Sequence, residues 1–98
     1  MRINFALIKY GNDGTSIEKT YSGTCERDIC IDFIFDKVRN WLVYYNFDLS
    51  GVISISKKEL IMSFDNIKIV VSTNESLFNF ENYNSVLNKE FEIIRGKI

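Results

Sequence analysis

The spacing of apolar residues changes several times along this chain, and each change limits what the segment can fold into. Between residues 2 and 10, apolar side chains alternate with other residues, as in a half-buried β-strand. Between about residues 24 and 47 they recur with a period of about 3.6, which is typical of an amphipathic helix. Alternation returns after Gly51, and helical spacing returns near residue 83. The chain is therefore predicted to be an α+β protein with the element order ββαβββα.

The first two strands are predicted to form a hairpin. The apolar positions of the first strand share one side: Ile3, Phe5 and Leu7. Residues 11–14, Gly-Asn-Asp-Gly, follow it and tolerate the positive φ of a tight turn. The returning segment has a weaker pattern around Ile17 and Tyr21, which indicates an edge strand protected by its charged residues. Gly23 is expected to end it.

A long helix is predicted from Thr24 to about Phe47. Thr24 is the expected N-cap, because a threonine hydroxyl can accept a hydrogen bond from the first turn. One face is apolar, with Cys30 at its margin: Ile31, Ile34, Val38, Trp41, Leu42 and Tyr45. Trp41 lies at the centre of this face, so we expect it to be buried. Leu49, Ser50 and Gly51 are expected to close the helix.

Three antiparallel strands are predicted next, as a meander. Their alternating apolar residues are Ile53 and Ile55, then Leu60, Met62 and Phe64, then Ile67, Ile69 and Val71. Asp65 and Asn66 form a two-residue turn between the last two strands. Because these side chains need an apolar cover, the long helix is expected to lie across this sheet.

The C-terminal part is predicted to be a loop followed by a second helix. Residues 73–81 are mostly polar, and three apolar side chains are expected to anchor them: Leu77, Phe78 and Phe80. Helical spacing then extends over residues 83–94, and Gly96 is a natural stop.

Composition narrows the class of protein. The 98 residues, 46% of them hydrophobic, suit one domain spanning residues 1–98. A net charge of −1 provides no general positive surface for nucleic acid. No apolar stretch approaches the roughly 20 residues of a membrane helix, and the N-terminus lacks a signal-peptide core. We expect a soluble cytoplasmic protein with neither a nucleic-acid nor a membrane partner.

Histidine is absent from the sequence, which removes the Ser-His-Asp and Cys-His types of catalytic site. Cys25 and Cys30, the two cysteines, cannot complete the usual four-ligand zinc site by themselves. We therefore expect reduced structural thiols, no metal and no cofactor. Residues 11–14 lack the Gly-Lys-Ser/Thr of a phosphate-binding loop, so they are interpreted as a turn. The sequence favours a protein that is not an enzyme.

Asp28, Asp32 and Asp36 recur every four residues and are predicted to form one acidic stripe on the long helix. Three apolar residues flank the stripe: Ile29, Phe33 and Val43. One interpretation is a solvated face whose apolar neighbours pack under the second helix. The other is a partner-binding surface for a basic protein, in which the aspartates steer the encounter and Phe33 and Ile29 anchor the complex.

The segment 53–65, Ile-Ser-Ile-Ser-Lys-Lys-Glu-Leu-Ile-Met-Ser-Phe-Asp, resembles in its rhythm the central hairpin of the cloacin-type immunity proteins. These belong to the small antitoxins that protect bacteria against colicins and contact-dependent growth-inhibition toxins. The resemblance implies neutralisation of a cognate toxin, a nuclease with a basic cleft, by covering its active site. The nearly balanced charge of this chain departs from the more acidic family, and no family contact residue is carried over.

Two alternative functions remain open from the sequence. A phage-encoded inhibitor of a bacterial defence protein would use the same physics on another target. A structural subunit of a homo-oligomer would instead pair with itself through the exposed edge strand or through Ile29 and Phe33.

Overall fold

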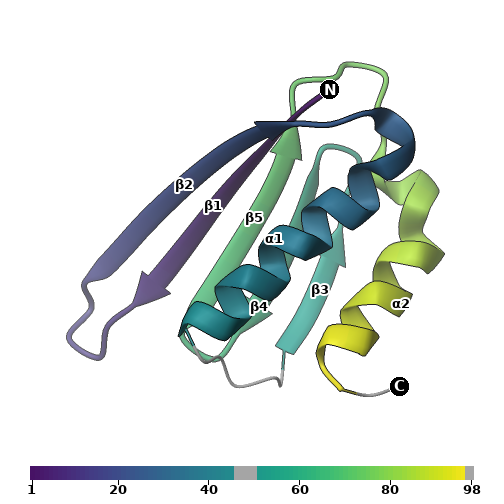
Figure 1. Ribbon diagram of the computed structural model, residues 1–98. Helices are drawn as coiled ribbons and strands as arrows, with labels where there is room; N and C mark the ends of the chain where they lie inside the picture. The colour runs from purple at the N-terminus through teal and green to yellow at the C-terminus, as the bar shows by residue number, and fades with distance from the viewer. Residues whose placement is uncertain (46–50, 97–98) are drawn as a thin grey trace.

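The computed structural model describes residues 1–45 and 51–96 (Figure 1). Its strands and helices, with two short 3₁₀ turns η1 and η2, follow in this order: β1 (Arg2–Tyr10), β2 (Ser16–Thr24), η1 (Arg27–Ile29), α1 (Cys30–Tyr45), β3 (Gly51–Ile55), β4 (Glu59–Phe64), β5 (Ile67–Thr73), η2 (Phe80–Tyr83) and α2 (Asn84–Ile94). The predicted α+β class and the order ββαβββα are confirmed.

The strands form one antiparallel sheet in the order β2-β1-β5-β4-β3. The predicted hairpin and the predicted meander are both present, and the pairing of β1 with β5 joins them. In that pairing Phe5 lies opposite Val71 and Leu7 lies opposite Ile69. Because β1 and β5 occupy the middle, β2 and β3 become the two edges of the sheet.

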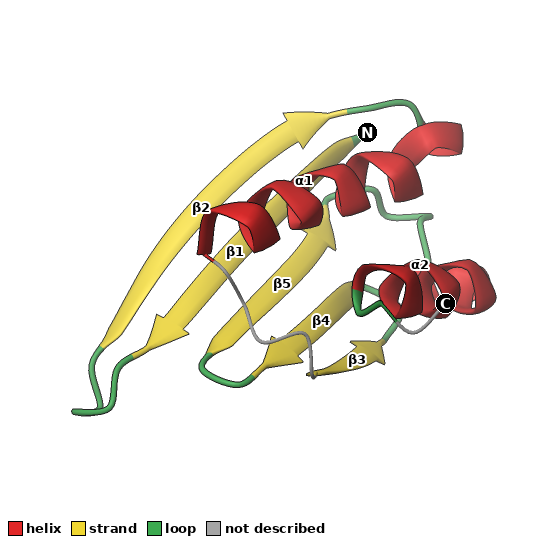
Figure 2. Cartoon of the chain, turned by 60° about the horizontal axis from the view of Figure 1, so that its bottom comes forward, coloured by secondary structure: helices red, strands yellow, loops and turns green. Residues whose placement is uncertain are grey.

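Both helices lie on the same face of the sheet, and no described helix covers the opposite face (Figures 1 and 2). Each helix packs against a different part of the sheet. Trp41 of α1 packs edge-on against Phe5 of β1, with ring centroids 6.1 Å apart. Phe91 of α2 lies against Phe64 of β4 at 5.9 Å. The long helix was expected to lie across the meander, but its Trp41 packs against β1 of the hairpin. The C-terminal helix packs against the meander through Phe91 and Phe64.

The core consists of the alternating residues that the strand patterns predicted, together with one face of each helix. Trp41 is 8% exposed, which confirms its predicted burial. Phe35 is completely buried as well, although it lies outside the face that the helical spacing predicted. Phe78 and Phe80 anchor their loop as expected, whereas Leu77 is 83% exposed and anchors nothing. Gly96 follows α2 with a φ of 72°, a conformation that glycine adopts without strain.

The predicted start of the long helix is wrong. Strand β2 continues through Gly23 to Thr24, and Thr24 lies opposite Arg2 in the sheet instead of capping a helix. The chain then turns through η1, whose preceding residue Glu26 makes no side-chain cap, and α1 begins at Cys30. Pairing with β1 thus outweighs the capping preference of threonine. The predicted helix end near Phe47, the closing residues 49–50 and the side chain of Tyr45 lie outside the described residues.

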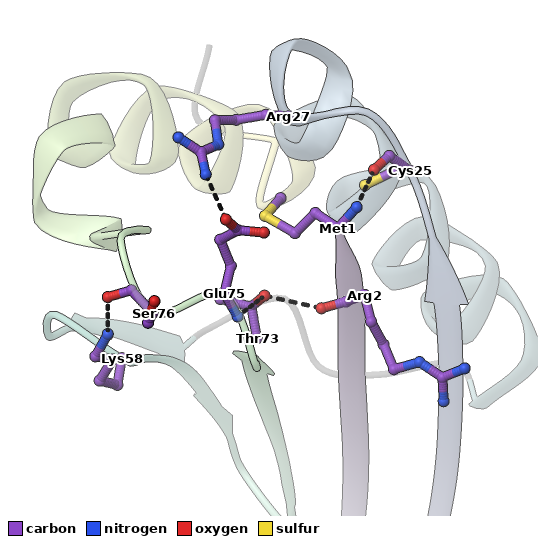
Figure 3. A network of polar contacts seen from close by, with 8 residues as sticks. All are labelled: Met1, Arg2, Cys25, Arg27, Lys58, Thr73, Glu75 and Ser76. Carbon is purple, nitrogen blue, oxygen red and sulfur yellow. Dashed lines mark hydrogen bonds and ion pairs between the residues drawn. The ribbon is translucent and has the colours of Figure 1, made fainter.

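A polar network ties η1 to the end of β5 (Figure 3). The Thr73 hydroxyl donates to the carbonyl of Arg2 at 2.8 Å and accepts from the backbone N–H of Glu75 at 3.2 Å. The Glu75 carboxylate in turn pairs with Arg27 at 2.7 Å. Two further bonds join neighbouring segments: the Met1 ammonium donates to the Cys25 carbonyl at 3.0 Å, and Lys58 Nζ donates to the Ser76 carbonyl at 2.9 Å. The network positions the turn from which α1 starts.

The packing of Trp41 gives a direct test of the helix-on-sheet arrangement. Trp41→Ala should lower the free energy of unfolding by about 3–5 kcal/mol, because it removes a large buried side chain that contacts β1. The matched control is Val43→Ala, two residues away and 86% exposed, which should cost less than about 0.5 kcal/mol. Urea denaturation followed by far-UV circular dichroism measures both. Equal midpoints for the two variants would contradict the packing.

Candidate functional site

The three aspartates of the predicted stripe are exposed, but they do not lie on one helix. Asp32 and Asp36 belong to α1, whereas Asp28 belongs to η1. The side chain of Asp36 is 75% exposed. All three carboxylates are therefore accessible to a partner, as a partner-binding surface requires.

Arg39 connects this stripe to the second helix. Its guanidinium contacts Asp36 at 3.2 Å, one turn away on α1, and Glu90 of α2 at 3.0 Å. Because the Arg39 side chain is 44% exposed, water screens these pairs and each contributes little stability. The pairs orient Arg39 toward α2.

Apolar side chains stand at both ends of the stripe. Ile29 is 49% exposed and Val43 is 86% exposed. Asp32, Asp36 and Val43 follow the spacing i, i+4 and i+11 on α1, which places them along one side of the helix. Ile29 is the last residue of η1, directly before α1 begins. We call these four residues the outer face of α1. It presents two carboxylates between two exposed aliphatic side chains.

Phe33 does not belong to this outer face. It is partly buried on the side of α1 toward the hairpin, where its ring centroid lies 6.0 Å from that of Phe5. A Cβ built on Gly23 would lie 2.5 Å from Phe33 Cζ, so the glycine makes room for this ring against β2. Phe33 is thus neither an exposed anchor nor a residue packed under α2, and we leave it out of the proposed interface.

A groove of about 300 Å³ lies between β2 and the C-terminal half of α1. It is lined by Lys19, Lys37, Asn40, Trp41 and Tyr44. The two ammonium groups stand near aromatic rings: Lys37 Nζ lies 4.2 Å from the ring centre of Tyr21 and 4.8 Å from that of Trp41, and Lys19 Nζ lies 5.6 Å from that of Tyr44. These distances are in the range of cation–π interactions. The walls of the groove therefore carry cationic and aromatic side chains.

Sequence reasoning did not find this groove. The signal within α1 is the spacing of Lys37, Trp41 and Tyr44 at i, i+4 and i+7, which places them on one side of the helix. The other wall can be predicted only if the side chains of Lys19 and Tyr21 are known to face the helix. That follows from their register opposite Leu7 and Phe5, which the weak β2 pattern alone does not reveal.

The pKa of each of the two thiols is raised. Burial raises the pKa of Cys30, and the neighbouring Cys25 raises it further. Burial also raises the pKa of Cys25, although the N-terminal ammonium opposes the shift. Both cysteines are free thiols, and a raised pKa disfavours the thiolate that reacts or binds metal. Within the described ranges, no three acidic or cysteine side chains gather as metal ligands would.

The outer face of α1 and the groove are two distinct surfaces of the protein. No protein-family model, curated protein or solved structure matches the chain. None of the helices in the described part has the length and apolar character needed to cross a membrane.

The contact between Gly23 and Phe33 predicts a coupling between these two positions. Gly23→Ala should destabilise the protein, because the added methyl group meets the Phe33 ring. In a Phe33→Ala background the same change should cost less, because the close contacts that remain for the methyl group are with the Tyr21 side chain, at 3.2 and 3.3 Å. A double-mutant cycle by urea denaturation should give a coupling of about 1 kcal/mol or more. Combining Gly23→Ala with Val43→Ala is the additive control, and additivity in both cycles would contradict the placement of β2 against α1.

Proposed function

We propose that this protein is a non-enzymatic, protein-binding inhibitor, and specifically an immunity protein that neutralises a cognate bacterial toxin by covering its active site. The observation that carries the proposal is the outer face of α1, where Asp32 and Asp36 stand between Ile29 and Val43. Exposed apolar side chains at both ends of a charged row suit an interface, because charge directs the encounter and apolar burial holds the complex.

The outer face has a size that a partner can use. From Ile29 to Val43 it extends for roughly 20 Å at 1.5 Å per helical residue. A standard interface buries about 800 Å² on each partner, and a helix row of this length with its neighbours can supply much of that area. The helix itself is held by Trp41 in the core, so its outer face is presented on a packed element.

The partner chemistry follows from the charge of this face. Carboxylates one helical turn apart disfavour each other by a few tenths of a kcal/mol, and Arg39 compensates Asp36. A basic surface would relieve the repulsion that remains. Nucleases have such surfaces, because they bind the phosphate backbone through positive charge. A nuclease toxin with a basic cleft is therefore the partner we propose.

The same outer face would also serve a phage-encoded inhibitor of a bacterial defence protein. The gene beside the one for this chain distinguishes the two, since an immunity protein requires a toxin gene and an anti-defence inhibitor requires phage neighbours. A homo-oligomer would instead show a multiple of the chain mass in solution by light scattering.

A neutralisation assay tests the proposal. Cells that express the adjacent toxin gene should survive when they also produce this chain. The variant Asp28→Asn/Asp32→Asn/Asp36→Asn should associate with the purified toxin about tenfold or more slowly at low salt, with a flatter salt dependence. Ile29→Ala/Val43→Ala should instead speed dissociation by about tenfold, since lost apolar contacts act mainly on the dissociation rate.

The control for charge is Glu18→Gln/Glu59→Gln/Asp65→Asn, which removes the same number of negative charges away from the outer face. Glu18 and Glu59 lie opposite Ile8 and Ser72, on the uncovered side of the sheet. This control should leave the rate constants within about twofold of the original protein, because distant exposed charges are screened. Toxin activity that persists in the presence of the chain would refute the function. Equal effects of the two triple variants would refute the outer face as the interface.

A further inference from the structure

Strand β2 is an unusually open edge. In the described sheet it pairs only with β1, and that pairing runs without a bulge over all nine residues of the strand. Every residue of β2 is exposed except Gly23, which is half-buried. Proteins protect such an edge with charged side chains, a bulge, a proline or a short strand, because its unpaired backbone groups can bind another strand. Apart from its charged residues Glu18 and Lys19, β2 has none of these protections.

The open edge lies beside the groove. Ile17, Lys19 and Tyr21 face the helices, because they lie opposite Lys9, Leu7 and Phe5 of β1. Ile17 is 63% exposed and Tyr21 is 41% exposed. A strand added next to β2 would place every second side chain on this same side of the sheet, next to these residues.

The lysines of the groove determine which side chain on such a strand would bind there most favourably. Among the described residues that line the groove, Lys19 and Lys37 each present an ammonium group, and the others are Asn40, Trp41 and Tyr44. An acidic side chain brought between the two ammonium groups would gain from both. On either side of that point, Ile17 and Tyr21 offer apolar surface.

We propose that the edge of β2 binds an extended segment of another protein as an additional strand. The segment carries an acidic residue that faces Lys19 and Lys37, with apolar residues two positions before and two positions after it that face Ile17 and Tyr21. Backbone hydrogen bonds to the edge provide affinity, and the alternating side chains provide specificity. The recognised pattern is apolar-x-acidic-x-apolar.

A second copy of this chain fits the edge less well in the register that pairs its apolar residues. When two β2 strands pair antiparallel so that Ile17 of each lies opposite Tyr21 of the other, the two Lys19 residues lie opposite each other. Like charges directly opposite destabilise a strand pair, and Lys37 adds to the repulsion. Charge complementarity therefore favours a different, acidic segment. This surface is separate from the outer face of α1, so the proposal does not depend on the proposed function.

The test uses the full chain, labelled with ¹⁵N, and synthetic peptides with blocked ends. The acidic peptide is Thr-Val-Thr-Glu-Thr-Val-Thr. One control peptide has lysine in place of glutamate, and another has methyl groups on alternate backbone nitrogens. We expect the acidic peptide to shift the amide resonances of β2 and of Lys37 at millimolar concentration, and to bind at least tenfold more tightly than the lysine peptide. The N-methylated peptide should not bind, because it cannot pair with the edge.

Protein variants identify the groove as the source of this preference. Lys19→Glu/Lys37→Glu should reverse it, so that the lysine peptide binds better than the acidic one. The matched control Lys57→Glu/Lys89→Glu makes the same charge change at two exposed positions outside the groove, and it should keep the original preference.

Three results would overturn the proposal. The first is an acidic peptide that leaves the β2 resonances unchanged at millimolar concentration. The second is equal binding of the N-methylated peptide. The third is a concentration-dependent dimer that protects the β2 amides without any peptide, which would make a second copy the occupant of the edge. The toxin neutralisation assay does not report on any of these outcomes, so the two proposals can fail separately.

Discussion

The pairing of β1 with β5 is the interaction on which the rest of the structure depends. It runs from Ile3 opposite Thr73 to Lys9 opposite Ile67, so it brings together the beginning of the chain and a strand that follows both the hairpin and α1. Without it, the chain would contain a two-stranded hairpin and a separate three-stranded meander, and an isolated hairpin is marginally stable in water. With it, one sheet is wide enough for two helices. Bringing β1 and β5 together has an entropic cost, because it closes a long loop of the chain. The burial of Phe5, Leu7 and their neighbours offsets this cost.

The positions of the two surfaces that we propose for recognition follow from this pairing. Because β1 is central, β2 becomes an edge with one neighbour, and α1 packs over β1 through Trp41 and Phe5. This packing buries one face of α1 and leaves the opposite face, from Ile29 to Val43, exposed. It also places the Lys37 side of α1 beside Lys19 of β2 and so creates the groove. Both surfaces are presented by packed elements, which reduces the entropy lost when a partner binds.

The sequence was sufficient for the elements and for much of the core. The alternation at Phe5 and Leu7, and at Leu60 and Met62, predicted which side of each strand is buried, and the helical spacing predicted the burial of Trp41. The neighbour of each strand was not predictable, because alternation specifies a buried face and not the strand that lies alongside. The start of α1 was missed for a related reason, since Thr24 has a capping preference that its pairing with Arg2 overrides. Phe33 was wrongly predicted to be an exposed anchor. Its burial depends on the space left by Gly23 on β2, which the spacing within the helix does not reveal. The exposure of the acidic residues was predictable from helical spacing. The groove was not, because it forms only where β2 and α1 pack together.

Amide hydrogen exchange by NMR tests the central claim, that β1 is an interior strand and β2 is an open edge. The account predicts that amides along β1 and β5 exchange slowly throughout, because these strands have neighbours on both sides. Along β2, protection should alternate: amides that face β1 should exchange slowly, and those that face outward should exchange at nearly the rate of an unfolded peptide. Rapid exchange along β1, or uniform protection along β2 in the monomer, would contradict the strand order from which both proposed surfaces are derived.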